Sequence, residues 1–204
     1  MIAIIDYGVG NLFSLHSSLQ RVGVDAVVTS DKQVIKNADK IILPGVGAFE
    51  DAAKKLRESG LDSVLKEEVQ KGKYLMGICL GMQLLFEKSY EYGEHEGLGF
   101  LKGEVVPMKG KISEELKIPH IGWNALQFER PHFLFQDLKE GDYVYFVHSY
   151  YASACEDSLL ATTDYGIKMT AAVEKNNVMG CQFHPEKSGD IGLKILRSFC
   201  EYKD

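Results

Sequence analysis

The amino-acid sequence predicts an α/β fold in three layers, with a mostly parallel sheet, helices on both faces and antiparallel additions in the C-terminal half. Two observations support this class. In the first half of the chain, short apolar runs alternate with amphipathic segments, which is the order that a parallel sheet requires. In the second half, short strand-like runs dominate. The 204 residues are enough for one full core, so we expect a single domain over residues 1–204.

Strand, turn and helix alternate four times in the first half of the chain. Leu12, Leu15, Leu19 and Val22 share one face of the first helix. The predicted strands cover residues 2–6, 25–29, 40–43 and 73–76. The predicted helices cover residues 12–22, a short stretch from 31, residues 49–70 with a break near 59–60, and a stretch from 82. This order predicts a flavodoxin-like sheet.

The second half begins with a region, residues 90–130, that is broken by glycines and prolines. Within it, residues 98–101 and 104–107 predict short strands, and residues 119–124 predict a loop. Further strands are predicted at residues 143–148, 159–163, 171–174 and 178–183, and a last helix at 189–202. Asn176 and Asn177 fit a hairpin turn before the last of these strands.

Composition and charge exclude several classes of function. The formal net charge of -6 argues against a nucleic-acid partner, and no stretch is long and apolar enough for a membrane span. The strand predicted at residues 2–6 leaves no room for a signal peptide. Four cysteines without a close pair indicate reduced thiols, a cytoplasmic protein and no zinc site. Gly8 and Gly10 lack the third glycine of a dinucleotide fingerprint, so we expect no cofactor.

Cys79 lies between Gly77 and Gly81, where a buried strand is predicted to turn into a helix. This is the arrangement of a nucleophile elbow, with sulfur in place of a hydroxyl group. The N-terminus of the following helix would favour the thiolate. The alternative is a core cysteine after a strand.

A cysteine nucleophile needs a base, and the base needs a group that orients it. Pro185 favours extended geometry at His184, so that His184 and Glu186 can share one side of the chain. The alternative is a surface pair. His148, followed by the possible nucleophile Ser149, is the competing base, and we prefer His184 because only it has a carboxylate at a usable spacing.

A second glycine turn follows the third predicted strand, at Pro44-Gly45-Val46-Gly47. Glycines on both sides of one valine permit unusual backbone angles, and such a loop can direct N–H groups at a developing negative charge. A tight strand-to-helix turn is the structural alternative.

Taken together, four motifs carry a resemblance to a known family. They are residues 44–47, 77–83, 148–150 and 182–186, and they occur in the order seen in class I glutamine amidotransferases. Residues 6–11 and 119–124 and the length of the chain are, more narrowly, similar to the glutaminase subunits of imidazole glycerol phosphate synthases. The resemblance covers nearly the whole chain and implies one class I glutamine amidotransferase domain.

The resemblance implies roles for individual residues. Cys79 would attack the side-chain amide of glutamine, His184 would move the proton, and Glu186 would orient the imidazole. The backbone N–H groups of Val46 and Leu80 would form the oxyanion hole. The implied glutamine-binding residues are Gly47, Gln83, His148, Ser149 and Tyr150.

The resemblance also implies a partner. Ammonia would pass into a (β/α)₈ barrel cyclase subunit that makes imidazole glycerol phosphate and aminoimidazole carboxamide ribotide. Asn11, Trp123 and Lys187 match positions at the family's subunit interface. The alternative for Trp123 is a core position, and the alternative for Lys187 is a solvated charge. For Gln83, the alternative to glutamine binding is a place on an exposed helix face.

Other functions remain open at this point. The same glutaminase chemistry could feed another synthase, such as one that modifies a surface sugar. A stand-alone cysteine hydrolase could act on γ-glutamyl compounds without a partner. A flavodoxin-like binding module would leave the cysteine inert.

Overall fold

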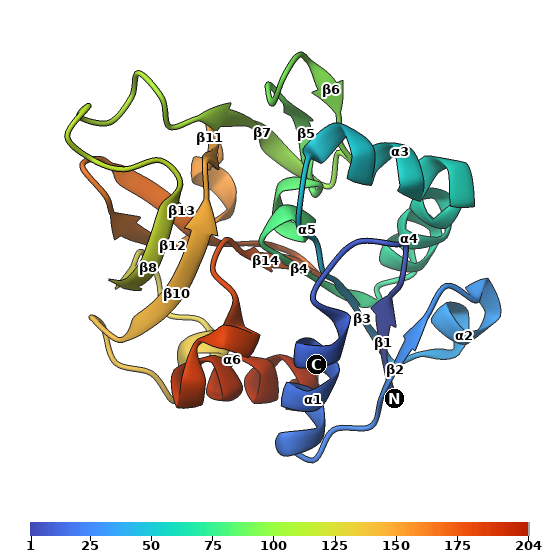
Figure 1. Ribbon diagram of the computed structural model, residues 1–204. Coiled ribbons are helices and arrows are strands. Elements are labelled where there is room, and N and C mark those ends of the chain that lie inside the picture. The colour runs from blue at the N-terminus through green and yellow to red at the C-terminus, as the bar shows by residue number, and fades with distance from the viewer. Residues whose placement is uncertain (204) are drawn as a thin grey trace.

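Parallel strands form one half of the central sheet and antiparallel strands the other (Figure 1). The computed structural model describes residues 1–203. The strand order is β2-β1-β3-β4-β14-β13-β12-β9, and the first five of these strands run parallel. The bounds are β1 Ile2–Ile5, β2 Ala26–Thr29, β3 Lys40–Leu43, β4 Tyr74–Ile78, β14 Val178–Cys181, β13 Lys168–Lys175, β12 Leu159–Asp164 and β9 Gln127–Phe128. The start of this order is that of flavodoxin-like sheets, as predicted.

Helices cover both faces of the sheet, and β1 and β3 are accordingly buried along their whole length. Two core clusters lie on the two sides. On one side are α1 Leu12–Arg21 and α6 Gly189–Glu201; on the other are α2 Lys32–Asn37, α3 Phe49–Ser59 and α4 Leu61–Gln70. Gly60, in the left-handed region at φ 66°, makes the predicted break between α3 and α4. No helix among residues 1–203 has the length and apolarity needed to cross a membrane.

Two smaller sheets are built on the carboxyl side of the central strands. One has the order β11-β7-β5-β6, and the other pairs β10 with β8. Their bounds are β5 Phe86–Ser89, β6 His95–Glu96, β7 Leu101–Pro107, β8 His120–Ala125, β10 Tyr143–His148 and β11 Tyr150–Ser153. Three short 3₁₀ turns, η1 Phe133–Phe135, η2 Glu156–Ser158 and η3 Pro185–Lys187, complete the elements.

The predicted loop at residues 119–124 is wrong, because residues 120–124 lie in β8. Every residue from His120 to Ala125 pairs with β10. The side chains of Ile121 and Trp123 point outward and are 59% and 54% exposed, so the usual alternation of buried apolar residues is inverted. Ile121, Trp123 and Ala125 do alternate with His120, Gly122 and Asn124, but Pro119 and Gly122 in the same stretch favour a loop.

The helix expected from Met82 to Glu87 is also shorter than predicted. It is the single turn α5 Leu80–Gln83, and β5 starts at Phe86. The carbonyl groups of Leu84 and Leu85 accept the N–H groups of Leu98 and Phe100, and this pairing turns the chain into an extended path. Of the strand expected at residues 98–101, only Leu101 belongs to a strand, β7.

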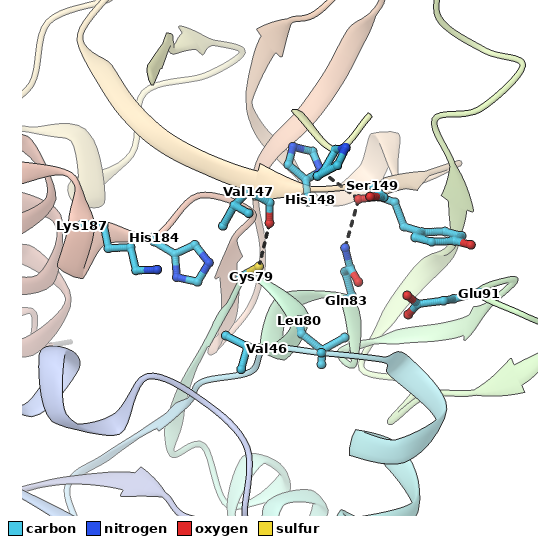
Figure 2. A pocket seen from close by; sticks show the side chains of 13 residues that line it. Val46, Cys79, Leu80, Gln83, Glu91, Val147, His148, Ser149, His184 and Lys187 are labelled. Carbon is cyan, nitrogen blue, oxygen red and sulfur yellow. Dashed lines mark hydrogen bonds between the residues drawn. The ribbon is translucent and has the colours of Figure 1, made fainter. Parts of the chain in front are cut away.

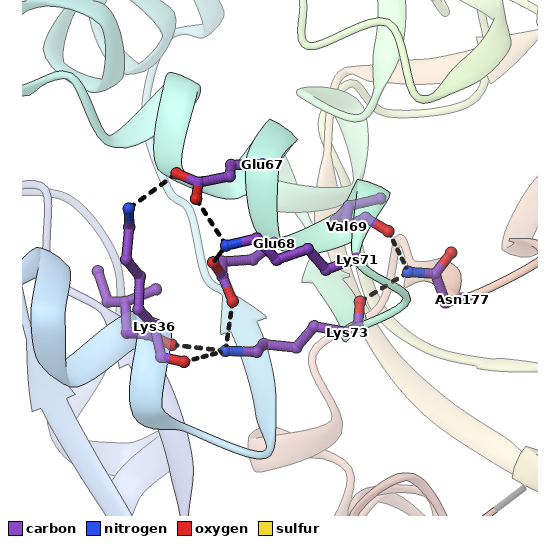
Figure 3. A network of polar contacts seen from close by, with 8 residues as sticks. Lys36, Glu67, Glu68, Val69, Lys71, Lys73 and Asn177 are labelled. Carbon is purple, nitrogen blue, oxygen red and sulfur yellow. Dashed lines mark hydrogen bonds and ion pairs between the residues drawn. The ribbon is translucent and has the colours of Figure 1, made fainter.

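A polar network lies at the starts of the central strands, at the end opposite the glycine turns (Figure 3). The Lys73 ammonium contacts the Glu68 carboxylate at 2.7 Å and donates to the carbonyls of Ile35 and Lys36. The Asn177 amide donates to the carbonyls of Val69 and Lys73. These contacts fix the starts of β4 and β14, the two strands whose other ends lead to Cys79 and His184.

Candidate active site

The turn after β4 holds Cys79 in a strained conformation. Its backbone has φ 55° and ψ −111°, a combination that residues with a side chain rarely adopt. A Cβ at Gly81 would lie 1.9 Å from the carbonyl oxygen of Leu43, and one at Gly77 would lie 2.6 Å from that of Gly81. Only glycines therefore permit the turn. The Cys79 N–H donates to the Cys181 carbonyl at 2.8 Å and ties the elbow to β14.

The nucleophile elbow is thus present, but the long helix that was expected to favour the thiolate is not. α5 contains four residues, so its dipole is that of a single turn. The sulfur instead has two weak polar contacts. The Val147 carbonyl lies 3.8 Å from it, and the Gln182 side-chain amide donates to it at 3.7 Å. Gln182 is a neighbour of the sulfur that the sequence analysis did not single out.

His184 and Glu186 form the pair that their spacing predicted. His184 is extended, at φ −99° and ψ 99°, and its Nδ1 lies 2.8 Å from Glu186 Oε1. The two side chains are 2% and 3% exposed. The surface alternative is therefore wrong. Because Nδ1–H donates to the carboxylate, Nε2 is left free; it is buried and has no hydrogen-bond partner among residues 1–203.

The free face of the His184 ring is directed toward Cys79 (Figure 2). Burial by itself would lower the pKa of His184, but the Cys79 sulfur and the Glu186 carboxylate outweigh burial and raise that pKa to about 9. At neutral pH the imidazole is therefore protonated, and it faces the sulfur as a cation. An imidazolium in this position favours a cysteine thiolate.

His148 cannot serve as the competing base. Its Nδ1 donates to the Tyr150 carbonyl at 2.8 Å, and its Nε2 lies 3.2 Å from His120 Nδ1. Burial lowers the pKa of His148 to about 3, so the ring stays neutral. The sequence offered no partner for His120, whose ring stacks on Tyr165. His120 and His148 thus form a buried pair that fixes the backbone next to Ser149.

A pocket of about 420 Å³ joins these elements, within the usual size range of small-molecule sites. It brings together most of the predicted site residues: Val46, Gly47, Cys79, Leu80, Gln83, His148, Ser149, Tyr150, His184 and Lys187. Glu186 lies behind His184, while Asn11 and Trp123 do not line the pocket. Glu91 also lines it, at the end away from His184, and the sequence analysis missed this residue (Figure 2).

Gln83 is buried, so the alternative of an exposed helix face is wrong. Its side chain is fixed on both sides, because the amide nitrogen donates to the Tyr150 carbonyl at 3.1 Å and to Gln182 Oε1 at 3.0 Å. These bonds hold α5 against β11 and against the segment that follows β14. The amide of Gln83 is therefore a fixed polar group on the wall of the pocket.

Trp123, Tyr145 and Lys187 form a row beside the pocket. The Trp123 ring meets the Tyr145 ring edge-on at 6.1 Å, and the Lys187 ammonium lies over the Tyr145 ring at 5.9 Å. Trp123 is half exposed, which excludes the core alternative. Asn11 is the residue before α1, and its side chain makes no capping bond.

Comparison with known proteins gives one consistent family. The model of the family "Glutamine amidotransferase class-I" matches residues 3–201. "Imidazole glycerol phosphate synthase subunit HisH" of Caldanaerobacter subterraneus subsp. tengcongensis is 54% identical over 98% of both chains. The protein of the same name from Aquifex aeolicus is 52% identical, over 96% of this chain and 94% of its own.

Solved structures show the same fold at lower identity. A structure described as "Crystal structure of glutamine amidotransferase" superposes with a TM-score of 0.75 at 20% identity, covering 97% of this chain and 99% of the other. PurLQS from Thermotoga maritima superposes with a TM-score of 0.74 at 22% identity, over 97% and 96% of the two chains. With the cysteine elbow and the His-Glu pair in one pocket, these matches show that the chain belongs to the class I glutamine amidotransferase family.

Proposed function

We propose that this chain is the glutaminase subunit of an imidazole glycerol phosphate synthase in histidine biosynthesis, acting through one amidotransferase domain over residues 1–204. The observation that carries the chemistry is the arrangement of Cys79, His184 and Glu186. A strained cysteine faces a buried imidazole nitrogen that has no other partner, and the second nitrogen is held by a carboxylate at 2.8 Å. This is the nucleophile, base and orienting group of covalent acyl transfer.

In the proposed reaction, the Cys79 thiolate attacks the carboxamide carbon of glutamine, and the His184 imidazolium then gives its proton to the departing nitrogen. Ammonia leaves, and the acyl group stays on sulfur as a thioester. A water molecule loses a proton to His184 and attacks the thioester, which releases glutamate and restores the thiolate–imidazolium pair. The N–H groups of Val46 and Leu80 would stabilise the oxyanion in both steps.

The far end of the pocket fits the α-amino and α-carboxylate groups of glutamine. The Glu91 carboxylate supplies the negative charge that an ammonium group needs. Backbone groups at Ser149 and Tyr150 would bind the α-carboxylate, which is supported by the contact of His148 with the Tyr150 carbonyl and with His120 beside them. Gly47 and Gln83 would complete the contacts between the two ends.

A (β/α)₈ cyclase subunit is the proposed partner and ammonia acceptor. The curated relatives are named as subunits of a synthase, which supports an assembly. Large apolar side chains on α1, β8 and β10 are exposed, and a partner would cover them: Phe13, Ile121, Trp123 and Tyr143. Asn11 and Lys187 would join this interface. We place the assembly in the cytoplasm, where the four free cysteines would stay reduced.

The test measures glutamate release from glutamine by the purified chain, alone and with the cyclase subunit and its nucleotide ligand, with Cys79→Ala as the control. We expect low activity alone, a sharp rise with the partner and none in the variant. If the activity of a folded chain does not change when this partner is added, the partner is another synthase. If the chain is fully active alone, it is a γ-glutamyl hydrolase. Activity that survives Cys79→Ala would refute the catalytic assignment.

A further inference from the structure

The loop that would supply the Val46 N–H is attached by a side chain at each end. At its start, the buried Tyr7 hydroxyl donates to the Pro44 carbonyl at 2.7 Å. At its end, the Phe49 N–H, the first of α3, donates to Glu91 Oε2 at 2.7 Å. The oxyanion loop, residues 44–48, is therefore held between two side chains that come from other parts of the fold.

The attachment to Glu91 replaces a local helix cap. The residue before α3 is Ala48, whose backbone has the extended geometry of a capping residue but whose side chain cannot accept a hydrogen bond. By contrast, α2 is capped by its own Asp31. The start of α3 thus depends on a carboxylate from the segment after β5, and a displacement of Glu91 would displace the end of the oxyanion loop.

Glu91 is itself fixed, and it reaches the substrate pocket. Its own N–H donates to the Ser89 hydroxyl at 3.2 Å. Burial raises the pKa of its carboxyl group, while the Phe49 N–H and His95 oppose this rise. One carboxylate oxygen is taken by Phe49, and the carboxylate also lines the pocket opposite His184, so its second oxygen can accept an ammonium group.

We propose that Glu91 is a positioning residue that couples the amino end of the substrate to the oxyanion loop: one oxygen binds the ammonium group while the other holds Phe49 and, through it, Val46. This rests on the proposed glutaminase function. An oxyanion donor acts only in the transition state, so its displacement lowers kcat, whereas a lost contact to the ammonium group raises KM. Glu91 contributes to both the oxyanion loop and the ammonium site, and its effects on kcat and KM can be separated.

The variants Glu91→Gln and Glu91→Ala separate them in the complex with the cyclase subunit. Gln keeps an oxygen that accepts the Phe49 N–H but loses the charge; Ala loses both. We expect both variants to raise KM for glutamine by about tenfold or more. Glu91→Gln keeps kcat within about threefold, while Glu91→Ala lowers kcat by on the order of tenfold to a hundredfold. Tyr7→Phe removes the hydrogen bond to the Pro44 carbonyl at the start of the oxyanion loop, and it should lower kcat with little change in KM.

Two readouts do not depend on the variants folding equally well. Amide hydrogen exchange over residues 45–50 should speed up in Glu91→Ala and stay unchanged in Glu91→Gln. In the unaltered complex, glutaric acid monoamide, which is glutamine without its amino group, should have a KM about tenfold or more above that of glutamine and a kcat within about threefold, because Glu91 still holds the loop. In Glu91→Ala, the two substrates should have similar KM values.

Equal kcat values for the Gln and Ala variants, or equal KM values for the two substrates in the unaltered complex, would overturn the proposal. Unchanged exchange at residues 45–50 in Glu91→Ala would do the same. A complex that releases no glutamate at all would instead refute the proposed function, so the two failures can be told apart.

Discussion

Replacing Glu186 by Gln tests the electrostatic basis of the site. The change removes one negative charge at nearly constant volume from a side chain that is 3% exposed. His184 has a pKa of about 9 against an ordinary value near 6.5. This difference corresponds to about 3 kcal/mol in favour of the protonated ring, which the Cys79 sulfur and the Glu186 carboxylate supply together against the effect of burial.

Without the carboxylate, we expect the pKa of His184 to fall by at least about one pH unit, because burial then meets less opposition. Titration of the ¹³C-labelled histidine ring by NMR measures this directly. Since a neutral Gln can also hold the wrong ring tautomer, kcat/KM should fall on the order of 10²- to 10⁴-fold. Glu174→Gln is the matched control, because Glu174 pairs with Arg130 away from the pocket and should leave both quantities unchanged.

The contribution of the His184–Glu186 pair to the free energy of unfolding should depend on pH with a defined sign. The pKa of His184 is higher in the folded chain than in the unfolded one, so the pair stabilises the fold fully below about pH 6.5 and loses that contribution as the pH rises through about 9. The gap in unfolding free energy between the parent chain and Glu186→Gln should therefore shrink across this range. A gap that widens with pH, or an unchanged pKa of His184 in the variant, would refute the reasoning.

Two further predictions concern the framework around the site. Gly81→Ala should cost more than about 3 kcal/mol of unfolding free energy, because its Cβ would lie 1.9 Å from the Leu43 carbonyl oxygen. Gly47→Ala should cost about 1–2 kcal/mol, because its only obstacle is the backbone angle φ of 93°. Similar urea midpoints for the two variants would contradict this. Lys73→Met should cost about 2–3 kcal/mol because it leaves the buried Glu68 carboxylate with only the exposed Lys71 as an ionic partner. The double variant with Glu68→Leu should lose less than the two single variants added together, and strict additivity would count against a coupled pair.

The parallel half of the fold could be predicted because its signals are local. Each central strand is a short apolar run covered on both faces, and a glycine or capping residue marks where it ends. For the same reason the sequence located Cys79 and its elbow, and the two-residue spacing located Glu186 beside His184. These contacts need only the nearest turns of the chain.

The parts that were missed depend on distant contacts. β8 carries Ile121 and Trp123 on its exposed side, so no contact with the core marks it as a strand. α5 stops after one turn because residues 98–101, far along the chain, take its following carbonyl groups. No local pattern in the sequence marks Glu91 or His120. The role of Glu91 depends on its contact with the start of α3, and that of His120 on its contact with His148.

The place of β14 in the sheet has a consequence for synthesis of the protein. This strand is inserted between β4 and β13, and it delivers both the carbonyl that holds the Cys79 elbow and the segment that carries His184. The pairing joins residues about a hundred positions apart, a high-contact-order step that has to come late. A nascent chain on the ribosome that still lacks residues 178–188 thus has Cys79 but not the proposed base His184, and by the proposed mechanism it would not release ammonia before synthesis of these residues is finished.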